Sequence, residues 1–132
     1  IYICSHSSGA HVVGLLAVSN WAADWSLPAD VIKGAIAVSG IYDLKPARLS
    51  SRNTYLLLDD AAVERNSALP NLSENMPPMI IAYGSRNSLS FNTKAANSPR
   101  RSRHAATTAN SSSSITITIL KGPRKSPTRP AH

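Results

Sequence analysis

Residues 1–18, with the sequence IYICSHSSGAHVVGLLAV, decide the fold of this chain. Residues 1–4 are β-branched, aromatic or otherwise apolar, a composition typical of a short strand buried in a parallel sheet. Residues 12–18 are apolar on most sides and predict a buried helix that ends near Asn20. Small and polar residues join the two runs, so the stretch predicts a strand, a tight turn and a helix in succession.

The turn at residues 5–9 (SHSSG) has the form of a nucleophile elbow, a sharp strand-to-helix turn written G-x-S-x-G. The flanking residues must be small because the strained turn brings their Cα atoms close to neighbouring backbone. The turn exposes the serine Oγ and places the next backbone N–H at a helix N-terminus, where it can stabilise an oxyanion. Ser7 is therefore the candidate nucleophile and Ser8 the candidate oxyanion donor, while Ser5 replaces the first glycine. The alternative is an ordinary serine-rich turn that caps the helix.

Two further apolar runs predict strands, one at residues 31–38 and one at residues 79–83. Between them, acidic residues at 59–60 precede a short Ala- and Val-containing stretch. Carboxylates are favourable at a helix N-terminus, so this pair predicts the start of a helix. Strands that alternate with helical stretches indicate an α/β fold with a parallel sheet and flanking helices.

The character of the sequence changes after Phe91. Residues 92–114 are rich in Ser, Thr, Asn, Ala and Arg without an apolar period, which predicts disorder. Residues 115–120 alternate Ile and Thr and predict a strand. Residues 121–132 are basic and contain three prolines, so we expect them to be extended or disordered.

The distribution of charged residues also changes after Phe91. Residues 1–91 contain six basic and all seven acidic residues, whereas residues 92–132 contain eight basic and no acidic residues, within a net charge of +7. We therefore expect a folded part followed by a basic tail. Such a tail can bind nucleic acid or an acidic partner. Phe91 is the last aromatic residue, however, so the tail lacks stacking groups, and a solvated tail is favoured over a nucleic-acid site.

Residues 2–11 (YICSHSSGAH) resemble the nucleophile segment of arylformamidases (kynurenine formamidases) and related α/β-hydrolase esterases. Similar segments follow at residues 27–35, 38–44, 79–84 and 88–91, so the resemblance covers about residues 1–91. It implies a partial α/β-hydrolase fold, in which this chain is the C-terminal part that begins at the nucleophile strand. It also implies hydrolysis of an N-formyl amide or an ester through an acyl-enzyme on Ser7.

The chain departs from the family pattern at the other catalytic positions. Asn87 stands where the family has the triad carboxylate; an asparagine can orient a histidine but cannot offset its charge. An ordinary loop role for Asn87 is the alternative. The base should follow the last strand, and neither His104 nor His132 matches that position. His6 and His11 belong to the elbow segment, where we expect local structural roles. The upstream loop that supplies the family's second oxyanion donor lies before the elbow, and this chain begins too late to contain it.

The resemblance ends where the family continues with a long amphipathic helix and its histidine segment. One hypothesis is that residues 92–132 are read in a shifted frame, which translation of the DNA in the other two frames tests. The triad is incomplete in this sequence, so we expect an inactive fragment of a serine hydrolase. The alternative is a catalytically dead fragment or pseudoenzyme whose basic tail binds acidic partners or nucleic acid.

Other classes of protein are not indicated. Cys4 is the single cysteine, which excludes an internal disulfide, argues against a cysteine-based metal site and fits a cytoplasmic setting. No apolar run approaches the roughly 18 residues of a membrane span. Without a metal-ligand cluster or phosphate-binding loop, we expect no cofactor and a small-molecule ester or formamide as the partner. The chain begins at Ile1 without a visible signal peptide, which suggests a fragment or a processed product.

Overall fold

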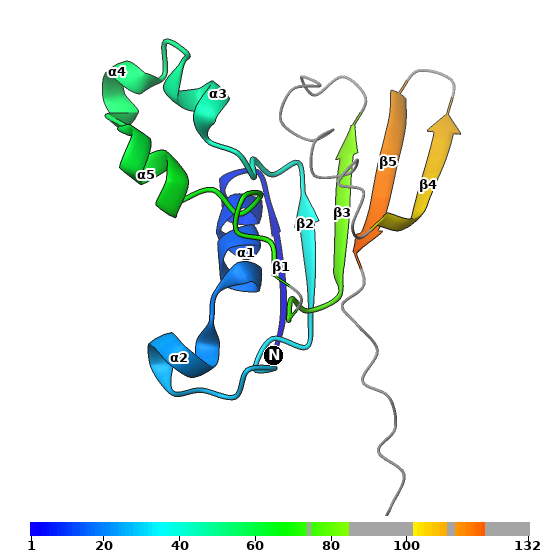
Figure 1. Ribbon diagram of the computed structural model, residues 1–132. Coiled ribbons are helices and arrows are strands. Elements are labelled where there is room, and N and C mark those ends of the chain that lie inside the picture. The colour runs from blue at the N-terminus through cyan, green and yellow to red at the C-terminus, as the bar shows by residue number, and fades with distance from the viewer. Residues whose placement is uncertain (74, 85–101, 111–112, 121–132) are drawn as a thin grey trace, which may run out of the picture.

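A computed structural model describes residues 1–73, 75–84, 102–110 and 113–120, and within these ranges five strands form one mixed sheet (Figure 1). The order across the sheet is β1-β2-β3-β5-β4. The strands are β1 (Tyr2–His6), β2 (Gly34–Val38), β3 (Met79–Gly84), β4 (Ser102–Asn110) and β5 (Ser113–Leu120). The helices are α1 (Ser8–Val18), α2 (Trp21–Trp25), α3 (Lys45–Arg48), α4 (Asn53–Leu56) and α5 (Asp60–Arg65).

The parallel part of the sheet confirms a strand at each of the three apolar runs, although the strand predicted over residues 31–38 begins only at Gly34. β1 pairs with β2, and β2 pairs with β3, both in parallel. The register aligns Ser5 with Ala37 and Ala37 with Ile81, so these three residues share one face of the sheet. Because the strands are parallel, their carboxyl ends meet at one edge, and the turn after β1 lies at that edge.

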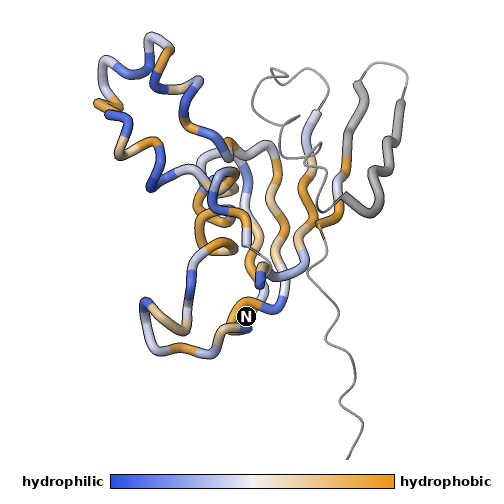
Figure 2. The backbone as a smooth tube through the Cα atoms, viewed as in Figure 1, coloured by the Kyte–Doolittle hydropathy of each residue, from blue (hydrophilic) through white to orange (hydrophobic). Residues whose placement is uncertain are grey.

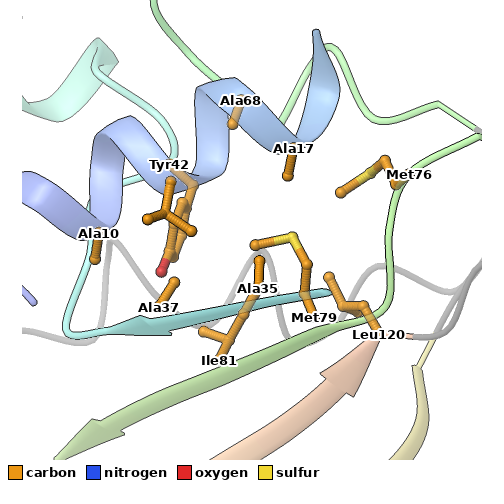
Figure 3. Packing of buried hydrophobic residues seen from close by; sticks show 11 residues of the cluster. Ala10, Ala17, Ala35, Ala37, Tyr42, Ala68, Met76, Met79, Ile81 and Leu120 are labelled. Carbon is orange, nitrogen blue, oxygen red and sulfur yellow. The ribbon is translucent and has the colours of Figure 1, made fainter. Parts of the chain in front are cut away.

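Helix α1 covers one face of the sheet with a stripe of small residues. Ala10, Val13, Gly14 and Ala17 are its buried residues, and they follow the spacing of a single helix face. Their small size brings α1 close to the buried side chains of β2 and β3, among them Ala35 and Met79 (Figure 3). Apolar residues are concentrated in α1, β2 and β3, as Figure 2 shows. The apolar core of the described part of the chain therefore lies between α1 and the sheet.

The C-terminal strands correct two expectations. The strand predicted at residues 115–120 is confirmed as part of β5, but it runs antiparallel to β3, so the sheet is mixed rather than parallel. The expected disorder is wrong for Ser102–Asn110, which forms β4 antiparallel to β5. Only two residues separate β4 from β5, and a connection this short joins antiparallel strands. The division expected after residue 91 lies outside the described residues.

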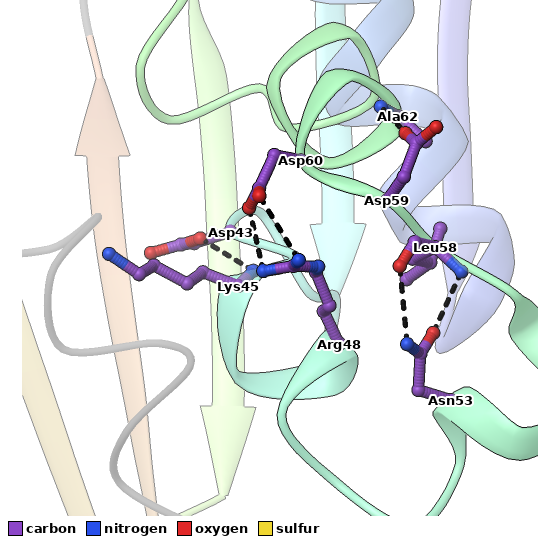
Figure 4. Close-up of polar contacts among 8 residues, drawn as sticks. All are labelled: Asp43, Lys45, Arg48, Asn53, Leu58, Asp59, Asp60 and Ala62. Atoms are coloured by element: carbon purple, nitrogen blue, oxygen red, sulfur yellow. Dashed lines mark hydrogen bonds and ion pairs between the residues drawn. The ribbon is translucent and has the colours of Figure 1, made fainter.

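Short helices occupy the two long connections around β2. Figure 1 shows α2 at the end of the sheet where β1 begins, and α3, α4 and α5 toward the end where β1 finishes. The predicted helix after the acidic pair is α5, and the Asp59 side chain caps it by accepting a hydrogen bond from Ala62 N at 2.6 Å. Arg48 pairs with Asp60 and thereby joins α3 to α5 (Figure 4). The helices α2, α3 and α4 were not predicted, because four or five residues carry too little periodicity.

Candidate nucleophile elbow

Ser7 lies in the turn between the end of β1 and the start of α1, with φ 57° and ψ −124°. A positive φ is uncommon for a residue with a side chain and is found where the surrounding structure enforces it. The Ser7 N–H donates to Val38 O at 2.9 Å, which ties the turn to the end of β2. The Ser7 carbonyl accepts from Ala10 N at 3.0 Å and from His11 N at 3.3 Å. The backbone of Ser7 is therefore held on both sides.

The side chain of Ser7 is exposed and does not cap the helix. A serine at an N-cap position ordinarily accepts a hydrogen bond from a backbone N–H of the first turn, and Ser7 makes no such bond. The hydroxyl is thus presented to solvent at the carboxyl end of the sheet. This geometry differs from that of the helix-capping turn considered as the alternative.

Ser8 is the first residue of α1. The first N–H groups of a helix have no acceptor within the helix, and they lie at the positive end of the helix dipole. No acidic side chain occupies the first turn of α1, so no carboxylate of that turn offsets this positive end. The Ser8 N–H therefore lies at the positive end of the α1 dipole, the position expected for the candidate oxyanion donor.

The glycine of the motif, Gly9, packs closely against Ser5. An ideal Cβ built on Gly9 would collide with Ser5 Oγ and would lie 3.0 Å from Ser5 Cβ. The serine at position 5 is therefore accommodated because residue 9 has no side chain. This explains physically how a chain with Ser5 in place of glycine keeps the turn.

The loop that follows β2 packs against the elbow. Ser39 has φ 52°, and its N–H donates to Ala82 O of β3 at 2.8 Å. The His11 side chain, one turn into α1, bonds through Nδ1 to the carbonyl of Ile41 at 2.7 Å. An ideal Cβ on Gly40 would lie 2.6 Å from the Tyr42 hydroxyl oxygen, so this position needs glycine. The loop after β2 and the first turns of α1 therefore form one packed unit.

Tyr42 fills the space between this loop and α1. Its ring lies against Gly14, and its hydroxyl points toward Ala10 and Ala37 (Figure 3). Burial raises the pKa of Tyr42 from 10.0 to about 12, an effect that contact with the backbone of Gly40 reduces. The hydroxyl makes no hydrogen bond of good geometry. Sequence reasoning did not single out Tyr42, because only packing shows that it lies beneath the elbow.

The remaining candidate residues are not brought to Ser7 by the described parts of the chain. Asn87 and His132 lie outside the described residues, and His104 belongs to β4. His6 is the exposed last residue of β1.

Within the described ranges, no group of three or more His, Cys, Asp or Glu residues could hold a metal ion. A search of the same ranges finds no helix with the length and hydropathy needed to cross a membrane.

Comparison with known proteins finds similar sequences, among them two kynurenine formamidases. The chain is 38% identical over 74 residues to a kynurenine formamidase from Danio rerio, which corresponds to 56% of this chain and 25% of that protein. It is 39% identical over 67 residues to a kynurenine formamidase from Salmo salar, or 51% of this chain and 22% of that protein. No protein-family model and no solved structure matches the chain. About half of the chain is thus similar to kynurenine formamidases, and the matching region spans about a quarter of their length.

Proposed function

We propose that this chain carries the nucleophile elbow of a serine hydrolase of the arylformamidase and carboxylesterase type, with Ser7 as the nucleophile. The observation that carries the proposal is the backbone of Ser7, an exposed serine held at φ 57° between a parallel strand and a buried helix. The similarity to kynurenine formamidases supports it independently, because those names describe hydrolysis of a formyl amide of kynurenine.

The proposed chemistry is acyl transfer through the serine. Ser7 Oγ attacks the carbonyl carbon of an N-formyl amide or an ester, and its proton passes to a base. The Ser8 N–H stabilises the oxyanion that forms on the carbonyl oxygen. The amine or alcohol leaves with a proton, and water then releases the acyl group from Ser7. No cofactor takes part in these steps, and the substrate is a small molecule.

The base is the element that this chain does not supply to Ser7 within its described residues. The described histidines have other positions: His11 is bonded to Ile41, His6 ends β1, and His104 belongs to β4. We propose that the chain acylates but does not turn over, since none of its described residues supplies Ser7 with a base. Where only solvent accepts the Ser7 proton, the oxyanion donor and the geometry of the elbow still favour slow acylation by an activated ester, and deacylation by water is slower.

Exposure of the chain to 4-nitrophenyl formate, followed by mass spectrometry of its peptides, tests this proposal. We expect slow, stoichiometric formylation at Ser7 and no further release of 4-nitrophenol. Ser7→Ala abolishes the modification. Ser8→Ala is the matched control, because it removes the neighbouring hydroxyl and keeps the backbone N–H.

Either of two results would overturn the assignment of Ser7: an unmodified Ser7, or the same extent of formylation in Ser7→Ala. Multiple turnover that depends on Ser7 would support the hydrolase assignment and overturn the proposal that the chain acylates without turning over.

A further inference from the structure

A closed circuit of contacts connects Ser7 to His11. The Ser7 N–H donates to the carbonyl of Val38, and the Ser7 carbonyl accepts from the N–H of His11. The His11 side chain then bonds to the carbonyl of Ile41, three residues after Val38 on the same loop. The circuit therefore runs from Ser7 to Val38, along the chain to Ile41, across to His11 and back to Ser7.

Both non-glycine residues with positive φ in this part of the molecule belong to the circuit. Ser7 has φ 57° and Ser39 has φ 52°. Such conformations are unfavourable for residues with a side chain and persist where surrounding contacts enforce them. The circuit is also fixed to the centre of the sheet, because the Ser39 N–H donates to Ala82 O of β3.

We propose that His11 is a positioning residue for the Ser7 elbow, acting through its hydrogen bond to Ile41. This proposal rests on the proposed function, since it assigns His11 to holding the nucleophile. A carbonyl oxygen can only accept, so Nδ1 of His11 carries the proton that it donates. The bond closes the circuit and couples the first turn of α1 to the loop after β2, which limits local opening of the turn that contains Ser7.

A purely structural role for His11 predicts a different response. If the bond only contributed to the stability of the domain, its loss would speed exchange at all core amides together through global unfolding. A positioning role predicts that opening increases at the elbow while the strands of the sheet remain closed. Native-state hydrogen exchange of the full chain, measured residue by residue by NMR, distinguishes the positioning role of His11 from a purely structural role.

The test compares the Ser7 amide with amides of β2 and β3 in three variants. In His11→Ala we expect Ser7 exchange to increase roughly two- to tenfold relative to the strand amides, the effect of one net hydrogen bond. In His11→Asn, whose side-chain amide can donate to the same carbonyl, we expect the original exchange rate at Ser7. Ser19→Ala is the control: it removes a side-chain bond to Leu15 O at the other end of α1 and should leave Ser7 unchanged.

Three results would contradict the positioning role: unchanged Ser7 exchange in His11→Ala, an equal rise at the strand amides, or no restoration in His11→Asn. The experiment needs no chemical reactivity of Ser7. If formylation fails but exchange responds as expected, the elbow is held by His11 and the proposed function is wrong. If formylation succeeds but the exchange of the Ser7 amide does not change in His11→Ala, the assignment of Ser7 as the nucleophile is supported and the positioning role of His11 is wrong.

Discussion

Tyr42 shows how one residue beneath the elbow affects stability through its polar group. The side chain is buried, and its hydroxyl has no hydrogen bond of good geometry. Removal of an unsatisfied buried hydroxyl can be neutral or stabilising, whereas removal of a buried aromatic ring costs about 3–5 kcal/mol. We expect Tyr42→Phe to unfold in urea at the same or a higher concentration than the original chain, and Tyr42→Ala at a much lower one.

The same residue predicts a dependence of stability on alkaline pH. Its pKa is about 12 in the folded chain and 10.0 without burial, so the folded state keeps the phenol proton more tightly. Its contribution to stability is present below pH 10 and is lost as the pH rises toward 12. At about pH 11 the loss is roughly 1 kcal/mol.

Urea midpoints at neutral pH and at about pH 11 test this dependence, and Tyr42→Phe should lose less stability on alkalinisation than the original chain. Equal losses in the two proteins would show that Tyr42 does not titrate differently in the folded state.

Helix α5 shows how an N-cap and an ion pair at neighbouring positions differ in their contribution to the free energy of unfolding. Asp59 accepts a hydrogen bond from Ala62 N, which satisfies a backbone donor at the start of a six-residue helix. Asp60 pairs with Arg48, but its side chain is 86% exposed. Loss of an N-cap costs about 0.5–2 kcal/mol, and an exposed ion pair contributes about 0–1 kcal/mol.

We therefore expect Asp59→Ala to lower the free energy of unfolding more than Asp60→Ala, as measured by urea denaturation at neutral pH. Asp59→Asn is the control, because asparagine is also a good N-cap. The reverse order of Asp59→Ala and Asp60→Ala would show that the ion pair between α3 and α5 matters more than the cap.

For the whole molecule, the main feature is an apolar row on the face of the sheet opposite α1. The register aligns Cys4, Ile36, Ile80 and Ile119 across four strands. Ile36 and Ile80 are 41% and 38% exposed. Parallel sheets ordinarily have both faces covered, and an exposed apolar face favours association.

We expect Ile36→Thr and Ile80→Thr to raise the concentration at which the chain begins to associate, with little change in the free energy of unfolding. Light scattering against concentration measures the first quantity and urea denaturation the second. Ile81→Thr is the matched control on the covered face, where Ile81 is 4% exposed, and it should lower stability because it buries a hydroxyl. If the two exposed positions do not change association, the apolar row is not what drives it.

The sequence by itself determined the elements around the elbow. The apolar run at residues 1–4, the small residues around Ser7 and the apolar run at residues 12–18 predicted a strand, a turn and a helix, which became β1 and α1. The strand β3 and the start of a helix at the acidic pair of residues 59–60 were also predicted. These features could be predicted because they depend on neighbouring residues: hydrophobic periodicity, side-chain size and the helix dipole all act within a few positions.

Only the tertiary structure decided which distant segments meet at the elbow and how the C-terminal strands pair. Nothing in the local pattern places Tyr42 beneath Ala10, or the carbonyl of Ile41 beside His11, because these contacts depend on how α1 packs on the sheet. The alternation of Ile and Thr in β5 did not specify its direction or its buried face. Thr118 is buried opposite Ile81, while Ile119 lies opposite the exposed Ile80. A shift of one residue exchanges the two faces of a strand, so pairing with β3, rather than hydrophobicity alone, decided which side chains entered the core.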